Sequence, residues 1–251
     1  ANRLKWRSVP VVAATFDSKC AYLGSGISNA SEGLDISGTV TSFGVIAERR
    51  IIDAEQRIYS VPLGSSWLVR GSTAAAGSIL EWARQLFDLD LTQVDALART
   101  APLDSSDPIF VPYLAGARAP LWQPLAQGSF TGLSLMTDRP AIVRAIYAGL
   151  ALSLRHIVDT IEDCGAPTRS IRLAGGLSRS AILAQMKADI LGRPVTVMAE
   201  SELTTLGLLA IGSTALGAFT DVQSATRTLA ACGASYQPRL SRRESDALFM
   251  R

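Results

Sequence analysis

The chain is poor in the residues that hold metals and form cross-links. Its 251 residues include one histidine, His156, and three cysteines that stand far apart, at positions 20, 164 and 232. Because no CxxC pair is present, we expect neither a structural zinc site nor a disulfide framework. A Ser-His-Asp triad is disfavoured, and we expect His156 to be a packing or surface residue. Such sparse cysteine use fits a reducing, cytoplasmic setting.

Charge is also scarce. Charged residues make up 18% of the chain, the formal net charge is +2, and no dense Lys/Arg run occurs. We therefore expect neither nucleic acid nor an anionic membrane as the main partner. The most apolar run, residues 203–219, is broken by Gly, Ser and Thr and is too short for a membrane span. It predicts a buried helix instead.

Several familiar site motifs are missing. The sequence has no GxxxxGK[ST], which excludes a P-loop enzyme, and no GxSxG. The glycines near residues 24–29 lack the third glycine of a dinucleotide fingerprint.

What is present is the pattern of an α/β domain. Hydrophobic residues make up 48% of the chain, enough for a substantial core. We predict strands at residues 10–16, 34–36, 40–46, 58–69, 109–114, 171–174 and 194–198. We predict helices at residues 18–24, 73–87, 140–163, 179–191 and 202–216, with a surface excursion at 92–107 and a loop at 115–127. Alternation of this kind indicates a mixed sheet flanked by helices.

One junction stands out at residues 173–180. A short apolar strand runs into Gly175 and Gly176, and Ser178 follows as a candidate cap for a helix that begins near Arg179. Glycines there let a ligand approach the backbone, and the first N–H groups of a helix attract phosphate. A tight turn without a ligand is the alternative.

Three further positions have the same ambiguity. Asp17 ends a predicted strand and could hold a proton or cap the next helix. The turn at Gly38 and Thr39 could hold a phosphate or be an ordinary hairpin. Gly77 could admit something flat beside its helix or only allow close packing.

Taken in order, these segments resemble the C-terminal domain of the FGGY family of carbohydrate kinases, with a xylulokinase-like pattern. The matching runs are residues 9–17 (VPVVAATFD), 36–39 (ISGT), 71–77 (GSTAAAG), 112–120 (PYLAGARAP), 128–133 (GSFTGL), 172–176 (RLAGG), 189–195 (DILGRPV) and 205–207 (TLG). The resemblance implies an actin-like, ribonuclease-H-like ATPase fold over residues 11–251. Residues 1–10 would then be a linker or the end of an N-terminal domain that lies outside this chain.

The resemblance also implies a reaction, in which the γ-phosphate of ATP, bound with Mg²⁺, passes to a hydroxyl of a sugar or polyol. A pentulose such as xylulose is the first candidate. Asp17 matches the carboxylate that deprotonates this hydroxyl, and no residue of the chain is assigned as a metal ligand. The positions that match the family's phosphate turn, nucleotide-flanking helix and adenosine loop are Gly38, Thr39, Gly77, Gly175, Gly176, Ser178 and Ser180.

Other interpretations stay open. Ala13, Ala14, Ser37, Val40 and Ala141 depart from residues common in the family. The chain could be a non-catalytic ATP-binding module, a degenerate kinase relative or an ATP hydrolase. Without the N-terminal kinase domain we expect the isolated chain to be inactive, and family members often form homodimers.

Overall fold

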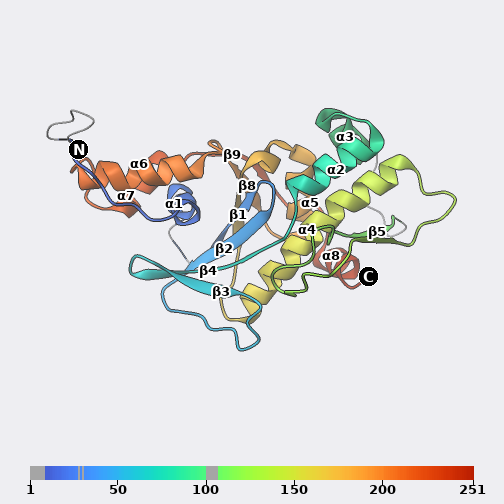
Figure 1. Cartoon of the computed structure of the whole chain (residues 1–251), viewed down its shortest axis with the longest axis horizontal. Helices are drawn as coiled ribbons and strands as arrows, with labels where there is room; N and C mark the ends of the chain where they lie inside the picture. The colour runs from blue at the N-terminus through green and yellow to red at the C-terminus, as the bar shows by residue number, and fades with distance from the viewer. Residues whose placement is uncertain (1–8, 28, 30, 100–106) are drawn as a thin grey trace. The chain divides into compact units, whose positions relative to one another are not determined.

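The computed structural model describes residues 9–27, 29, 31–99 and 107–251. These residues form two compact units (Figure 1). The first holds the described residues up to Gly26 together with Glu202–Ala231, and the second holds Ile27–Ser201 and Cys232–Arg251. All three cysteines are free, so no disulfide stabilises either unit.

A seven-stranded mixed sheet forms the frame of the second unit, with strand order β3-β4-β2-β1-β7-β8-β9. The strands are β1 Glu32–Ser37, β2 Thr41–Ala47, β3 Tyr59–Leu63, β4 Ser66–Ser72, β7 Ser170–Ala174, β8 Val195–Met198 and β9 Cys232–Tyr236. β1 runs antiparallel to β2 but parallel to β7, and β7 runs parallel to β8. The predicted mixed sheet is confirmed, and β1 stands at its centre.

The long helix α4, Arg139–Asp163, packs with α5, Ala181–Leu191, against this sheet (Figure 1). Asp138 caps α4, since its carboxylate accepts a 2.8 Å hydrogen bond from the N–H of Ala141. α4 is long and apolar enough to cross a membrane by composition alone, yet 78% of its most apolar window is buried inside the structure. Leu154, Ile157, Val158 and Ile161 of α4 lie in one apolar cluster with Phe43 and Val45 of β2, whereas Ile146 and Leu150 belong to a second cluster.

A second apolar cluster surrounds the N-terminal half of α4. It contains α2 Gly77–Phe87, α3 Leu91–Ala98 and the small sheet of β5 Ile109–Val111 with β6 Ser129–Thr131. The prediction of a surface excursion at 92–107 is wrong for α3. This helix forms because Asp90 and Gln93 make a capping box, while Val94 and Ala98 are buried. Residues 100–106 lie outside the described part.

Helix α2 begins four residues later than predicted. The N–H groups of Ala76 and Gly77 bond to carbonyls of the β1–β2 turn, so residues 73–76 stay extended or irregular. On α2, Leu86 is 59% exposed, whereas Leu80 is buried. The docking of the chain onto the β1–β2 turn therefore decides where the helix starts.

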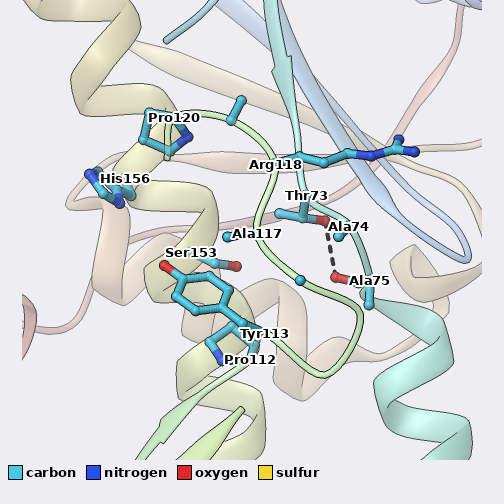
Figure 2. A pocket seen from close by; sticks show the side chains of 12 residues that line it. Thr73, Ala74, Ala75, Pro112, Tyr113, Ala117, Arg118, Pro120, Ser153 and His156 are labelled. Atoms are coloured by element: carbon cyan, nitrogen blue, oxygen red, sulfur yellow. Dashed lines mark hydrogen bonds between the residues drawn. The ribbon is translucent and has the colours of Figure 1, made fainter. Parts of the chain in front are cut away.

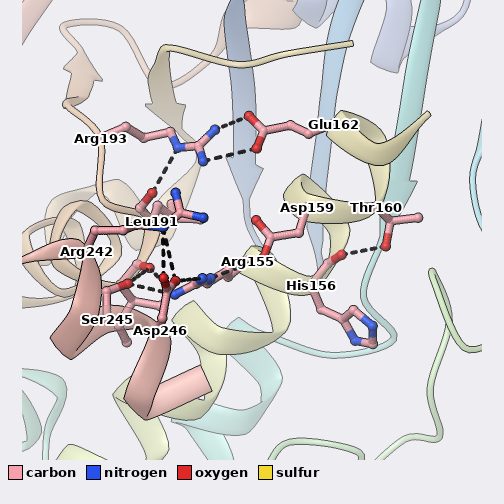
Figure 3. Close-up of polar contacts among 11 residues, drawn as sticks. Arg155, His156, Asp159, Thr160, Glu162, Leu191, Arg193, Arg242, Ser245 and Asp246 are labelled. Carbon is pink, nitrogen blue, oxygen red and sulfur yellow. Dashed lines mark hydrogen bonds and ion pairs between the residues drawn. The ribbon is translucent and has the colours of Figure 1, made fainter. Parts of the chain in front are cut away.

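Helix α8, Arg242–Phe249, packs on α4 and α5 in the second unit. The buried guanidinium of Arg155 donates to Ser245 Oγ at 2.7 Å and to Asp246 (Figure 3). It also lies 4.7 Å from the ring centroid of Phe249. Arg193 pairs with Glu162 in the same region. These charge-assisted bonds connect elements distant in sequence.

The first unit consists of α1 Asp17–Gly24, α6 Leu203–Ala215 and α7 Val222–Leu229. α1 and α6 touch backbone to backbone at two glycines. A Cβ on Gly207 would lie 1.9 Å from the carbonyl oxygen of Cys20, and one on Gly24 would lie 2.0 Å from that of Leu203. Only glycine permits this close approach.

Two predictions for this unit are wrong. Residues 10–16 form no strand and are mostly exposed, because no strand in the described part of the chain pairs with them. The predicted burial of α6 holds for one face only. Leu203, Gly207 and Ala210 are buried, but Leu208 and Leu209 are 45% and 50% exposed.

Candidate functional site

The turn between β1 and β2 is the first part of the candidate site. The N–H of Gly38 donates to the carbonyl of Val40 at 2.9 Å, which closes the turn tightly. A Cβ on Gly38 would have nothing within 4 Å, so the outer side of the turn faces open space. Thr39 is exposed beside it. This turn, Ser37–Val40, is called the phosphate turn, after the role that the sequence predicts for it.

The beginning of α2 docks on the phosphate turn. The N–H of Gly77 donates to the carbonyl of Gly38 at 2.9 Å, and that of Ala76 donates to the carbonyl of Thr39 at 2.8 Å. A Cβ on Gly77 would lie 2.6 Å from the carbonyl oxygen of Gly38. Close packing, one of the two interpretations of Gly77, is therefore seen directly.

The glycine loop, Gly175–Gly176, reaches the same point from β7. Gly175 has φ +87°, and a Cβ there would lie 2.5 Å from the carbonyl oxygen of Ser37. Gly176 is exposed, and a Cβ on it would meet nothing within 4 Å. The structure thus brings Gly38, Gly77 and Gly175 together, and at Gly38 and Gly176 the backbone faces open space.

The two serines after the glycine loop bond to the protein itself. A 3₁₀ turn, Gly176–Arg179, precedes α5, so Ser178 does not cap the helix as predicted. Its hydroxyl donates to the carbonyl of Gly175 at 2.7 Å. Ser180 caps α5 instead: it accepts from the N–H of Leu183 at 3.2 Å and donates to Asp95 at 2.8 Å. A role for either serine near a base or ribose stays a prediction.

Asp95 also accepts a 2.5 Å hydrogen bond from the hydroxyl of Tyr147. Burial, and then the neighbouring Asp95 carboxylate, raises the pKa of Tyr147, so this phenol stays protonated and keeps donating. Ser180 and Tyr147 thereby join α3, α4 and α5 close to the glycine loop.

A buried ion pair under the phosphate turn escapes the sequence analysis. Nζ of Lys187 lies 2.6 Å from Asp35 Oδ2 and 2.7 Å from Ser37 Oγ, and the exposed side-chain fractions of Lys187 and Asp35 are 2% and 0%. One signal was available. Lys187 stands four residues from both Leu183 and Leu191 on a helix, and Asp35 interrupts an apolar strand, so each charge lies on a face that predicts burial.

Asp17 belongs to the first unit, where it begins α1. It is exposed, and Oδ1 accepts a 2.6 Å hydrogen bond from the N–H of Ser18. Phe16 is the N-cap residue of α1 and no side chain caps this helix, so the capping interpretation of Asp17 is wrong. An exposed carboxylate at the start of a helix remains accessible to a ligand.

A pocket in the second unit lies beside the start of α2 (Figure 2). Thr73 lines this pocket and is hydrogen-bonded to β2. Its Oγ1 accepts from the N–H of Thr41 at 3.0 Å and donates to the carbonyl of Ala75 at 3.0 Å. Tyr113 and His156 line the opposite part, and burial raises the pKa of the first and lowers that of the second. His156 packs edge to face on Phe249 at 6.0 Å.

No group of three or more His, Cys, Asp or Glu side chains is placed to hold a metal ion among the residues that the structure describes. The site is thus built from backbone and small side chains. At Gly38 and Gly176 this site leaves the backbone open to a ligand, because no Cβ blocks its approach.

The chain is similar in sequence to glycerol kinases and to a xylulose kinase. The chain is 31% identical over 244 residues to a glycerol kinase from Alkalilimnicola ehrlichii, which covers 94% of this chain and 48% of the relative. It is 32% identical over 191 residues to a xylulose kinase from Escherichia coli, covering 74% of this chain and 39% of the relative. The chain spans about half the length of these relatives.

Solved structures agree with this fold. A ligand-bound xylulose kinase from Lactobacillus acidophilus superposes with a TM-score of 0.85 and 27% identity, covering 92% of this chain and 48% of that one. A Plasmodium falciparum glycerol kinase with ADP superposes with a TM-score of 0.84 and 22% identity, covering 92% and 47%. The fold is accordingly the actin-like ATPase fold of the sugar kinases. Residues 35–216 match the C-terminal domain of the FGGY family of carbohydrate kinases, and this chain belongs to that family.

Proposed function

We propose that this chain is the C-terminal half of an ATP-dependent carbohydrate kinase. Residues 1–10 would lead in from an N-terminal half, and residues 11–251 would form the nucleotide-binding domain. The observation that carries the proposal is the close approach of Gly77 to the carbonyl of Gly38 and of Gly175 to the carbonyl of Ser37, since a Cβ on either Gly77 or Gly175 would clash there. Family membership supports the same reaction class.

The phosphate turn and the glycine loop would bind the nucleotide. Their open positions, Gly38 and Gly176, have free space where a Cβ would lie, which fits a ligand pressed against the backbone. The described residues offer no carboxylate or imidazole cluster for a metal, which fits Mg²⁺ that arrives on the phosphates of ATP. There it would neutralise phosphate charge.

Asp17 would act on the second substrate. Phosphoryl transfer depends on positioning and charge neutralisation more than on covalent help from the protein. The carboxylate of Asp17 would accept the proton of the attacking hydroxyl while that oxygen forms its bond to the γ-phosphorus and the bond to the β-γ bridging oxygen breaks. The exposure of Asp17 supports this role.

The acceptor would be a sugar or polyol. Xylulose is our first candidate and glycerol the second, because relatives carry both names at nearly equal identity. We also propose that the working enzyme assembles as a homodimer.

The test is ADP release by the full-length polypeptide with Mg-ATP and a panel of ketoses, polyols and sugar acids. Asp17→Asn should lower substrate-dependent release by about a hundredfold or more and leave ADP affinity within about twofold. Asp221→Asn is the matched control, since Asp221 is an exposed capping carboxylate of the same unit and Asn caps equally well.

Wild-type turnover in Asp17→Asn would remove Asp17 as the base. Measurable ADP binding without release on any panel member would favour a non-catalytic nucleotide-binding module. Release that is independent of every acceptor would favour a hydrolase.

A further inference from the structure

The buried pair under the phosphate turn is the starting point. Lys187 comes from α5, whereas Asp35 and Ser37 come from the central strand β1. Lys187, Asp35 and Ser37 have exposed fractions of 2%, 0% and 0%, so water does not screen them. An ion pair in such a place gains little net stability, because both charges lose their hydration. Stability alone therefore does not explain why Lys187 and Asp35 are paired there.

The hydrogen bonds fix the hydroxyl of Ser37 in one orientation. Its proton goes to Asp35 Oδ1 at 2.7 Å, since Lys187 has only protons to give. Its oxygen then accepts from Lys187 at 2.7 Å and from Thr41 Oγ1 at 3.0 Å. Ser37 therefore has three partners from three directions, and its side chain cannot rotate without breaking at least one of them.

The backbone of the same residue holds the ligand-facing segments. A Cβ on Gly175 would lie 2.5 Å from the carbonyl oxygen of Ser37 and 3.1 Å from its nitrogen, so the glycine loop rests directly on Ser37. The carbonyl of Gly38, the next residue, accepts a hydrogen bond from the N–H of Gly77. A shift of Ser37 would displace the phosphate turn and the glycine loop together.

The network extends to the pocket side as well. Thr41, which contacts Ser37, donates its N–H to Thr73 Oγ1 at 3.0 Å, and Thr73 returns its own N–H to the carbonyl of Thr41 at 2.9 Å. Thr73 leads into α2. One chain of polar contacts thus joins α5, β1, β2 and the start of α2 beneath the candidate site.

We propose that Lys187 and Asp35 are positioning residues, which act through Ser37 to hold the phosphate turn at the spacing from the glycine loop that the nucleotide's phosphates require. This inference rests on the proposed function. It assigns the network to the phosphate end of the nucleotide, because Ser37 is part of the phosphate turn. Contacts to the base and ribose do not depend on it.

The first test is Ser37→Ala. This variant keeps the 2.6 Å pair of Lys187 and Asp35 but removes its connection to the turn. Calorimetry with ADP and with adenosine should show ADP affinity lowered by about tenfold and adenosine affinity within about twofold. ADP affinity that stays at the wild-type value, or an equal loss for both ligands, would overturn the proposal.

A double variant guards against misfolding. Lys187→Met with Asp35→Leu replaces both charges by apolar groups, and it should lower ADP affinity to the same degree as Ser37→Ala. Arg144→Met with Asp107→Leu is the matched control, because it removes another buried ion pair of the same unit, 2.8 Å long. The control should leave ADP affinity within about twofold. Equal ADP affinity in both double variants would contradict the proposal.

A second readout needs no nucleotide. Hydrogen exchange of the Gly38 amide, which is bonded to Val40, should be about tenfold faster in Ser37→Ala. Unchanged exchange would overturn the positioning role. Failure of the wild-type chain to bind ADP, with faster exchange in Ser37→Ala, would instead count against the proposed function and leave the positioning of the turn intact.

Discussion

The N–H of Gly77 donates a 2.9 Å hydrogen bond to the carbonyl of Gly38, and a Cβ on Gly77 would lie 2.6 Å from that same oxygen. The start of α2 and the turn after β1 are therefore in backbone contact. Because Gly175 contacts the preceding residue, Ser37, in the same way, three segments distant in sequence share one point.

Gly77→Ala should force the phosphate turn and α2 apart. The new methyl group would have to move a backbone carbonyl rather than a flexible side chain, so we expect the free energy of unfolding to fall by ~1–3 kcal/mol. Urea unfolding measures this change in the free energy of unfolding. Gly212→Ala is the control, since a Cβ there meets nothing within 4 Å in helix α6 and should stabilise by ~0.5–1 kcal/mol. Equal stability of the two variants would refute the contact.

Gly176→Val should separate binding from folding. A Cβ at this position meets no protein atom within 4 Å, so the free energy of unfolding should stay within ~0.5 kcal/mol of wild type, while ADP affinity drops by about tenfold or more. Gly175→Ala should instead destabilise by ~1–3 kcal/mol, because φ is +87° and Ser37 is in the way. Unaltered ADP affinity in Gly176→Val would remove Gly176 from the site.

Lys187→Met should be among the most destabilising single changes in the second unit. It leaves Asp35 buried without its ion-pair partner, at a cost of ~3–5 kcal/mol in the free energy of unfolding. Adding Asp35→Leu removes the stranded charge and should recover most of the loss. Urea unfolding of the single and double variants decides it, and a double variant as unstable as the single one would contradict the explanation.

Asp53 should contribute to acid unfolding. Its carboxylate accepts from the side chain of Arg57, which lowers the pKa of Asp53 from 3.8 to about 2. The unfolded chain takes up this proton near pH 3.8, whereas the folded chain does so near pH 2, so the contribution is present above about pH 5 and is lost as the pH falls toward 2.

Asp53→Asn should therefore flatten the loss of stability between pH 5 and about pH 2. The measurement is urea unfolding of wild type and variant across this window. Identical slopes for the two proteins would show that the pair of Asp53 and Arg57 contributes nothing to the acid limb.

Local pattern predicts much of this fold. The helix predicted at residues 140–163 is α4, and the strands predicted at residues 34–36 and 40–46 form the hairpin of β1 and β2. These elements are correct because their determinants lie within a few turns of chain. The capping box of α3 is equally local, because Asp90 and Gln93 stand three residues apart at the start of this helix.

Other features depend on partners that local pattern does not reveal. Lys187 meets Asp35 across 152 positions of sequence, so only the fold shows that the two charges are paired. Residues 10–16 have the composition of a strand, yet a strand needs a neighbouring strand that forms hydrogen bonds with its N–H and C=O groups. The start of α2 differs from the prediction for a similar reason, because carbonyls of the phosphate turn accept hydrogen bonds from the N–H groups of Ala76 and Gly77.

The most direct test of the site is hydrogen exchange of the chain with and without Mg-ADP. If the phosphate turn and the glycine loop bind the nucleotide, the amides of residues 38–40 and 175–177 should gain protection, and Gly176→Val should abolish that gain. Bound ADP that protects other segments while these two exchange as in the free chain would contradict the account.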